Sequence, residues 1–327
     1  MDNHKVHLIN GISVIICTYN GAQRLPATLR HLAAQQFSVF IPWEIIIVNN
    51  ASTDNTAEVI VNECTNLFTS IPFTILNEAQ KGKINALYTG VSRAKYSLFI
   101  ICDDDNNLAP DYLEKMFFRL NDDDRIGAAG GRSEALTDVE LPAWFNNYST
   151  HYAVGKQAET TGDVTSRGYL WGAGTGSRTD LFLSFYNTVP SLLTGRSTDK
   201  LLAGEDAEYN ARLILKGYSL FYDSALRFKH YIPSYRLTVT YRDGILEGIR
   251  QSMLIIDKYH LAFHMQQKLA ANMLNKTRLL MLTPLRIWLA ASEHIKTREK
   301  NKMQFLLPFS KVTDQDIIQI RKFLNWV

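Results

Sequence analysis

Two hydrophobic periodicities alternate along the first half of the chain. Short apolar runs rich in β-branched residues occur at residues 12–17, 44–49, 73–76 and 97–102. Between them, apolar positions recur every three or four residues at residues 25–35, 56–64 and 84–94. Continuous apolar runs are typical of parallel strands buried on both faces, whereas the longer repeat is typical of helices. The pattern predicts an open, mostly parallel α/β sheet with right-handed crossovers and helices on both faces.

The second half of the chain is less regular. A glycine-rich stretch, WGAGTGSR, occupies residues 171–178, and residues 204–218 predict a helix that Gly217 ends. Residues 221–236 indicate short strands or loops, and from about Thr240 the chain is predicted to be mostly helical. We therefore expect an α/β domain over residues 1–240 and a C-terminal helical region over residues 241–327.

Polar residues directly follow three of the predicted strands. They are Thr18, Tyr19 and Asn20 after the first strand, Asn49, Asn50, Ser52 and Asp54 after the second, and residues 103–106 after the fourth. In open α/β sheets, ligands bind beyond the carboxyl ends of the strands. We therefore expect these loops to converge on one binding site, with Asp54 or Thr53 also capping the helix that follows.

Three adjacent carboxylates, Asp103, Asp104 and Asp105, end the fourth predicted strand. Like charges at a partly desolvated strand end repel one another, so a positive group is expected beside them. One interpretation is a divalent cation held by one or two carboxylates together with substrate phosphates. The alternative is a set of solvated loop charges that precede the helix starting near Pro110.

Two further pairs of residues carry candidate chemistry. Glu205 and Asp206 open a predicted helix, where they either stabilise its dipole or supply a general base. His230 and Arg236 lie in FKHYIPSYR and could clamp a diphosphate. The WGAGTGSR stretch lacks the Gly-Lys-Ser/Thr ending of a P-loop, and no Gly-x-Gly-x-x-Gly follows the first strand. Nucleotide-triphosphatase and dehydrogenase functions are therefore disfavoured.

Charge is distributed unevenly along the 327 residues. Residues 256–327 contain twelve Lys and Arg against five Asp and Glu, although the formal net charge of the chain is only +3. This basic tail suggests either a solvated helical face or contact with an anionic surface. The three cysteines have no paired spacing, which favours a reducing compartment. The amino terminus lacks a signal-peptide pattern, and no segment is predicted to span a bilayer.

In their order along the chain, these motifs resemble those of the family 2 glycosyltransferases, which have the GT-A fold. The resemblance covers residues 12–236 and rests on SVIICTYNGAQRLPATL, EIIIVNNASTDNT, KGKINALYTGVSRAKYSLFIICDDDN, LAPDYLEKM, GAGTGSRTDLF and GEDAEYNARLILKGY. It implies metal-dependent, inverting transfer of a sugar from a nucleotide diphosphate to a hydroxyl of a glycan or lipid-linked acceptor. It also implies a nucleotide-sugar half, about residues 10–130, and an acceptor half, about residues 131–240.

The resemblance assigns metal-binding and catalytic roles to five acidic residues. Asp103 and Asp105 match the D-x-D metal motif, which implies Mn²⁺ or Mg²⁺. Asp104 is expected near the ribose or the metal. Asp206 matches the general base, and Glu205 is expected near the acceptor or the donor sugar.

The nucleotide-sugar site is assigned in the same way. Thr18, Tyr19 and Asn50 match positions of the nucleoside pocket, and Lys83 matches a basic position that reaches the base or the phosphates. The remaining expected members of this site are Asn20, Asp54, His230 and Arg236.

Two features depart from the family pattern. Asn49 stands where the family usually has Asp, and Asn50 where it often does, so contact with uracil would lack charge assistance. The nucleobase is therefore left open. The Gln-x-x-Arg-Trp motif of membrane polysaccharide synthases is missing, which argues against a processive synthase.

The leading hypothesis is an enzyme of cell-envelope polysaccharide biosynthesis that acts in the cytoplasm and has no nucleic-acid partner. One alternative is a non-catalytic nucleotide-sugar-binding or scaffold protein with the GT-A fold. Another is a sugar-phosphate nucleotidylyltransferase, although TYNGAQR lacks the glycine- and arginine-rich loop expected there. The C-terminal helices either pack on the catalytic domain or contact the inner face of the membrane through LLMLTPLRIWLAA, residues 279–291.

Overall fold

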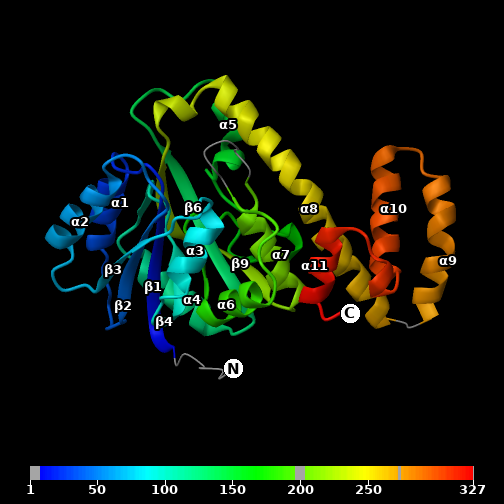
Figure 1. Cartoon of the computed structure of the whole chain (residues 1–327). Helices are drawn as coiled ribbons and strands as arrows, with labels where there is room; N and C mark the ends of the chain where they lie inside the picture. Colours follow the sequence, from blue (N-terminus) through cyan, green and yellow to red (C-terminus); the bar gives the residue numbers. More distant parts are fainter. Residues whose placement is uncertain (1–7, 196–202, 272–273, 327) are drawn as a thin grey trace.

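A mixed sheet with helices on both faces forms the centre of the computed structural model, which describes residues 8–195, 203–271 and 274–326 (Figure 1). Its strands within these residues are β1 (Ile9–Thr18), β2 (Trp43–Asn49), β3 (Phe73–Asn77), β4 (Tyr96–Ile101), β5 (Asn106–Leu108), β6 (Ile126–Leu136), β7 (Gly162–Asp163), β8 (Gly176–Arg178) and β9 (Ser219–Tyr231). The strand order is β3-β2-β1-β4-β8-β6-β9-β5, with β7 paired to β9. β1 to β4 are parallel to one another, as are β6 and β9, and the other pairs are antiparallel.

The helices alternate with the strands in the first half and follow one another in the last quarter. They are α1 (Leu25–Ala33), α2 (Thr56–Leu67), α3 (Lys83–Val91), α4 (Tyr112–Asp122), α5 (Phe145–Tyr148), α6 (Thr179–Thr188), α7 (Glu205–Leu215), α8 (Val239–Ala271), α9 (Leu274–Trp288), α10 (Glu293–Leu306) and α11 (Gln315–Phe323). The predicted open α/β sheet with C-terminal helices is confirmed. The strands and helices predicted for the first half are present, with ends shifted by up to three residues.

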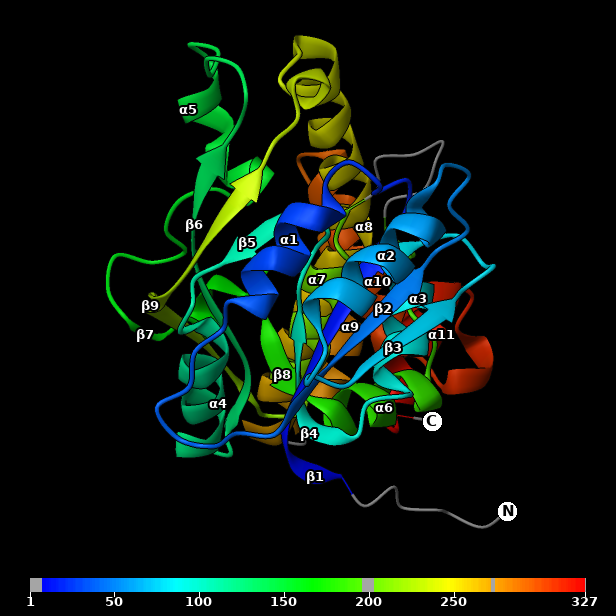
Figure 2. The same cartoon turned by 90° about the vertical axis from the view of Figure 1, so that its left-hand side faces the viewer.

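Helical layers lie on both sides of the sheet (Figure 2). Alternating side chains of β1 pack against both layers. Ile12, Val14 and Ile16 pack in the same apolar cluster as α1, α2 and α4. Ile15 packs in the opposite cluster, which contains α3, α6 and α7. Successive side chains of a strand point to opposite faces, so a continuous apolar run requires a helical layer on each side. This requirement is why the hydrophobic pattern identified the central strands.

The prediction of short strands or loops after residue 220 was wrong. Ser219–Tyr231 form one long strand, β9, and the turn Ser234–Arg236 follows it. β9 is hydrogen-bonded to β6 on one side and to β5 and β7 on the other. All three partners precede β9 by more than fifty residues, and the β6 pairing contains register shifts. Long-range pairing thus stabilises a strand whose local pattern is irregular.

The expected cap of α2 was also misplaced by at least one residue. Asn55 occupies the N-cap position and makes no capping hydrogen bond through its side chain. The carboxylate of Asp54 instead accepts hydrogen bonds from the backbone N–H and the hydroxyl of Thr56. Asp54 therefore still satisfies one N–H at the start of the helix, from the position before the cap.

The C-terminal helices divide into two groups. α8 packs against α7 and α11, and α11 inserts Ile317, Ile320 and Phe323 into the core beside Phe185. α9 and α10 form a hairpin at the far end of α8, where α9 is the outermost element (Figure 1). None of the described helices is both long and apolar enough to cross a membrane.

A buried ion pair joins α7 to its surroundings. Glu208 and Arg212 are fully buried on successive turns of α7, and Arg212 Nη2 donates to Glu208 Oε1 at 2.7 Å. The same carboxylate accepts hydrogen bonds from the backbone N–H groups of Leu192 and Leu193 and from the hydroxyl of Tyr259 on α8. Buried charges are tolerated only where such partners compensate for lost hydration. This network therefore fixes α7 relative to α8 and to the loop after α6.

We expect Arg212→Met to lower the free energy of unfolding by about 3–5 kcal/mol, because it leaves the Glu208 carboxylate buried without its cation. Urea denaturation followed by circular dichroism would measure this change. Arg125→Met is the matched control, since Arg125 pairs with Asp123 on the exposed surface, where such pairs contribute little. Equal stability losses in the two variants would contradict a structural role for the buried pair.

Candidate active site

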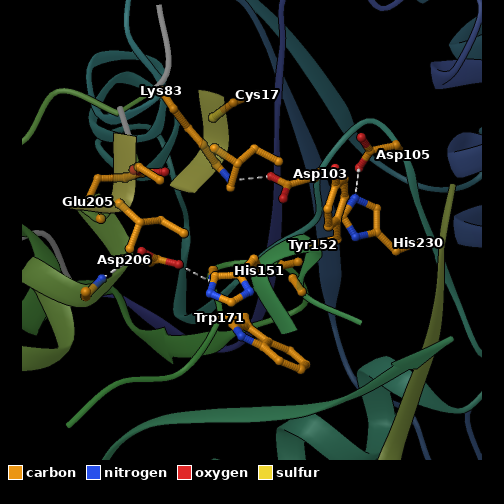
Figure 3. Close-up of a pocket in the computed structure, with 18 of the residues that line it drawn as sticks. Cys17, Lys83, Asp103, Asp105, His151, Tyr152, Trp171, Glu205, Asp206 and His230 are labelled. Carbon is orange, nitrogen blue, oxygen red and sulfur yellow. Dashed lines mark hydrogen bonds and ion pairs between the residues drawn. The ribbon is translucent and has the colours of Figure 1, made fainter. Parts of the chain in front are cut away.

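A cavity of about 500 Å³ lies where the carboxyl ends of β1 and β4 meet the start of α7 (Figure 3). Most of the residues indicated by the sequence line it, namely Thr18, Tyr19, Asn50, Lys83, Asp103, Asp104, Asp105, Glu205, Asp206, His230 and Arg236. Asn20 and Asp54 are not among the lining residues. Asn20 instead joins two loops, since its backbone N–H donates to Ser52 Oγ at 3.0 Å. The polar loops after β1, β2 and β4 therefore meet at one cavity, as their positions in the sequence predicted.

Each carboxylate of the acidic run contacts a cationic side chain from a different segment. Lys83 Nζ, at the start of α3, lies 2.5 Å from Asp103 Oδ1. Asp104 accepts hydrogen bonds from Arg24 Nη2 at 2.9 Å and from Thr18 Oγ1 at 2.6 Å.

Asp105, the third carboxylate, has two basic partners, one at the end of β9 and one in the turn that follows it. Arg236 Nη1 donates to Asp105 Oδ2 at 2.8 Å, and His230 Nε2 lies 3.4 Å from Asp105 Oδ1. Together with the partners of the other two carboxylates, these contacts show that the acidic run is not a set of solvated loop charges.

Burial and pairing set the charge states of this cluster. Burial acts to raise the pKa of Asp105, but the interactions of its carboxylate with His230 and Arg236 outweigh burial and hold that pKa well below the usual range. Burial has the larger effect on Asp104, whose pKa is raised even though Arg24 opposes the shift. Burial alone would lower the pKa of Lys83, but the Asp103 and Glu205 carboxylates raise it above its ordinary value. Lys83 therefore stays positively charged beside the acidic run.

Asn50 explains one departure from the family pattern. Its amide nitrogen donates to the backbone carbonyls of Glu78 and Gln80, at 3.1 and 2.8 Å. Its amide oxygen accepts the N–H of Gly82 at 3.0 Å, directly before Lys83. An ionised Asp has no proton to donate and would repel both carbonyls. The neutral amide thus holds the loop that delivers Lys83 to the cavity.

Asp206 lies at the start of α7 and is held in place by hydrogen bonds from two backbone N–H groups. Its Oδ2 accepts the N–H of Gly172 at 2.8 Å, and its Oδ1 accepts the N–H of Ala207 at 2.8 Å (Figure 3). Gly172 belongs to the WGAGTGSR stretch, and a Cβ added there would lie 3.2 Å from Asp206 Cβ. The absence of a side chain at Gly172 therefore permits this close approach. The carboxylate faces the cavity in a fixed orientation.

Sequence reasoning missed three groups of lining residues. They are Arg24, the aromatic residues His151, Tyr152, Tyr169 and Trp171, and the α8 residues Tyr241, Ile245, Ile249, Ser252, Met253 and Ile256. Arg24 could have been found as the first cation after the β1 loop. The α8 residues recur at helical spacing, which indicates one face of a helix. The sequence does not indicate, however, that this face meets a cavity rather than the core.

The family assignment follows from comparison with known sequences. Residues 13–180, about half of the chain, match the profile of "Glycosyl transferase family 2". The chain belongs to glycosyl transferase family 2. The matched residues include the acidic run, Lys83 and Gly172, whereas α7 and the C-terminal helices lie beyond them.

Two curated proteins are similar to part of this chain. An uncharacterized glycosyltransferase, YwdF, of Bacillus subtilis is 29% identical over 45% of this chain and 48% of its own length. Poly-beta-1,6-N-acetyl-D-glucosamine synthase of Staphylococcus aureus is 32% identical over 39% of this chain and 29% of its own length. The matched region thus spans about half or less of the length of these relatives.

Solved structures of TarS show the same fold. TarS of S. aureus, residues 1–349, aligns over 92% of this chain and 82% of its own, with a TM-score of 0.52 and 17% identity. The complex of the same TarS fragment with UDP-GlcNAc aligns with a TM-score of 0.50 and 15% identity, over 94% of this chain and 82% of the other. At such identities the similarity concerns the fold.

The D-x-D pattern of the acidic run implies a metal ion in the cavity. Within the described residues, no group of three or more His, Cys, Asp and Glu side chains is placed to hold a metal ion. Mg²⁺ commonly takes only one or two protein carboxylates and completes its shell with water and substrate phosphates. Beside these carboxylates, His230 Nε2 lies 3.4 Å from Asp105 Oδ1, and His230 Nδ1 is buried without a hydrogen-bond partner. The carboxylates of the acidic run therefore fit a cation whose coordination shell is completed by substrate phosphates.

Proposed function

We propose that this family 2 protein is an inverting glycosyltransferase that moves a sugar from a nucleotide-diphosphate donor to a hydroxyl of a glycan or lipid-linked acceptor. The observation that carries the proposal is the pairing of two functions in one cavity. One part of the cavity holds positively charged side chains paired with the acidic run. Another part holds the oriented carboxylate of Asp206. A diphosphate leaving group needs the positive charge, and a hydroxyl nucleophile needs the carboxylate.

The donor half offers positive charge where a leaving diphosphate develops negative charge. Lys83, Arg24 and Arg236 line the cavity, and each is paired with one carboxylate of the acidic run. These cations are held by protein carboxylates, so little reorganisation is needed when the phosphates arrive. Asp103 and Asp105 would hold Mn²⁺ or Mg²⁺, which would neutralise part of the diphosphate charge.

The acceptor half supplies the base. We propose that Asp206 takes the proton of the acceptor hydroxyl as the hydroxyl oxygen bonds to the anomeric carbon of the donor. The bond from that carbon to the diphosphate oxygen breaks in the same step, and the nucleotide diphosphate leaves with the electron pair. Attack from the face opposite the leaving group inverts the anomeric centre.

A direct displacement needs no nucleophilic side chain. The lining thiol, Cys17, is a poor candidate for one, because burial raises its pKa to about 12 and a thiol rather than a thiolate is present at neutral pH. This supports a single displacement over a covalent cysteine intermediate.

The donor is proposed to be a uridine diphosphate sugar. Solved TarS complexes contain UDP and UDP-GlcNAc, and the similar polysaccharide synthase is named for an N-acetylglucosamine polymer. UDP-GlcNAc is therefore the first donor to test. We further propose a role in cell-envelope polysaccharide biosynthesis on the cytoplasmic side of the membrane.

A non-catalytic nucleotide-sugar-binding protein with the same fold is the competing function. It would bind the donor but would have no use for a carboxylate fixed by Gly172 and Ala207. Slow hydrolysis of UDP-GlcNAc, with water in place of the acceptor, separates the two functions. Donor binding without any turnover in the presence of metal would favour the binding protein.

The C-terminal hairpin is proposed to contact an anionic membrane surface. Met281, Leu285, Trp288 and Leu289 recur at helical spacing on or just after α9 and are 74%, 51%, 81% and 62% exposed. Of residues 279–291, the side chains of Leu279 and Leu280 lie outside the described part of the chain. The apolar stripe is accompanied by exposed cations, namely Arg286, Arg298 and Lys300. Apolar side chains with a basic surround are typical of interfacial helices, which bind anionic lipid.

We expect Asp206→Asn to lower kcat for sugar transfer or donor hydrolysis by roughly 100-fold or more, with the affinity for UDP little changed. The amide is nearly isosteric but cannot accept the proton. Radiometric assay of sugar release and calorimetric titration of UDP would measure the two quantities.

Asp180→Asn is the matched control for this variant. Asp180 also lies in the first turn of a helix, and its Oδ1 accepts the N–H of the next residue, as that of Asp206 does. It is not among the residues that line the cavity. If Asp206→Asn retains the turnover of Asp180→Asn, Asp206 serves the helix dipole rather than the reaction.

Asp105→Ala should abolish the strengthening of UDP binding by Mn²⁺, because the variant lacks the carboxylate that would bind the cation. Calorimetric titrations of UDP with Mn²⁺ and with EDTA would show the effect without any assay of turnover. Asp123→Ala, which breaks a surface ion pair outside the cavity lining, should keep the full metal effect. Normal metal dependence in Asp105→Ala would rule out the D-x-D assignment.

The double variant Leu285→Ser, Trp288→Ser should co-sediment with phosphatidylglycerol vesicles several-fold less than the unchanged chain at low salt. The remaining binding should decrease further as salt screens the basic residues. Val61→Ser, Phe118→Ser removes two exposed apolar side chains from α2 and α4 and should bind normally. Failure of the unchanged chain to bind anionic vesicles would remove the membrane role.

A further inference from the structure

Two of the walls that line the cavity differ in chemistry. The wall formed by the loops after β1 and β4 and by the start of α3 is polar and charged. The opposite wall is one face of α8 and consists of Tyr241, Ile245, Ile249, Ser252, Met253 and Ile256. These positions recur every three or four residues, so their side chains lie along one stripe of the helix.

The α8 wall offers a saccharide few hydrogen-bond partners. Beyond Tyr241, Ser252 is its one polar residue among those described, and the Ser252 hydroxyl already donates to the backbone carbonyl of Gly248 at 3.0 Å. A sugar ring packed on Ile245, Ile249 and Met253 would bury hydroxyl groups without partners, which is costly. A hydrocarbon chain loses no hydrogen bonds there and gains from leaving water.

This apolar wall is continuous with the proposed base. Gly204 directly precedes Glu205 and Asp206, and a Cβ added to it would lie 3.1 Å from the Cβ of Ser252. Hydrocarbon lying along α8 would therefore begin beside the carboxylate that receives the acceptor hydroxyl. The wall is also open, since Met253 is 39% exposed. Methionine adapts its shape to flexible chains more readily than branched side chains do.

Resting on the proposed glycosyl transfer, we propose that α8 binds the hydrocarbon chain of a lipid-linked acceptor. The acceptor class is then a sugar or short glycan carried on a lipid, with its reacting hydroxyl at Asp206 and its hydrocarbon along Ile245, Ile249 and Met253. Sugar polymers without a lipid would lack this contribution. Loop residues on the polar wall select the donor, while α8 selects the acceptor.

The first test uses the unchanged full chain and a series of neutral probes with one sugar. Methyl, butyl and octyl β-D-glucoside are titrated below the micelle concentration of the octyl compound, and binding is followed by ligand-observed NMR in the presence of UDP. Affinity should rise with chain length, and the octyl compound should bind at least about tenfold more tightly than the methyl compound. Equal affinities across the series would overturn the proposal.

The second test locates the binding site of the hydrocarbon chain. The double variant Ile249→Ser, Met253→Ser should reduce octyl glucoside affinity at least about fivefold, because two apolar contacts are replaced by hydroxyl groups. Leu254→Ser is the matched control, since Leu254 is an exposed neighbour on α8 that does not line the cavity. Equal losses in both variants would overturn the assignment to the cavity wall. So would octyl binding that is removed by the α9 variant Leu285→Ser, Trp288→Ser instead.

UDP titration of the same preparations separates this proposal from the proposed function. UDP affinity should be equal in the unchanged chain and in the α8 variants, which also shows that the variants are folded. If UDP and UDP-GlcNAc do not bind the unchanged chain, the proposed function fails whatever the glucosides do. If they bind and the donor is hydrolysed while chain length has no effect, only the lipid-acceptor proposal fails.

Discussion

Three carboxylates at the end of one buried strand can remain ionised only where the fold brings positive charge to them. In this chain the charge comes from Arg24 before α1, Lys83 at the start of α3, and Arg236 after β9. These segments are far apart in the sequence. The ion pairs therefore also hold the loops after β1 and β3, and the end of β9, close to the end of β4. The architecture of the cavity and its electrostatic character therefore have one origin. The same cations that stabilise the acidic run are available to a diphosphate.

α7 carries a comparable constraint in the other half of the site. Its first turn presents Asp206 to the cavity, and its next turns bury Glu208 and Arg212. The Glu208 carboxylate gathers donors from the loop after α6 and from Tyr259 on α8. The orientation of the proposed base thus depends on buried contacts outside the cavity lining.

The sequence predicted those features that depend on local pattern and missed those that depend on distant partners. The central strands were visible because burial on both faces imposes continuous apolar runs, and the polar loops followed from the ends of those strands. β9 was missed because its pairing with β5, β6 and β7 compensates for an irregular local pattern. Arg24 was missed for a similar reason, since its role exists only relative to Asp104. The reason for Asn50 required knowing which carbonyls its amide meets.

α8 shows why a region that looks like an appendage in the sequence belongs to the site in space. Its later half packs Tyr259, Ala262 and Met265 into the core, while its earlier half turns Ile249 and Met253 toward the cavity. Because both halves belong to one helix, the hydrogen bond between α8 and Glu208 also helps to fix the position of the apolar wall beside Asp206. On the proposed function, a wall fixed in this way would keep the same distance from Asp206 while the hydrocarbon of the acceptor varies in length. Acceptor selection would then depend on the helix rather than on a loop, and the glycan attached to the lipid could differ without disturbing the catalytic geometry.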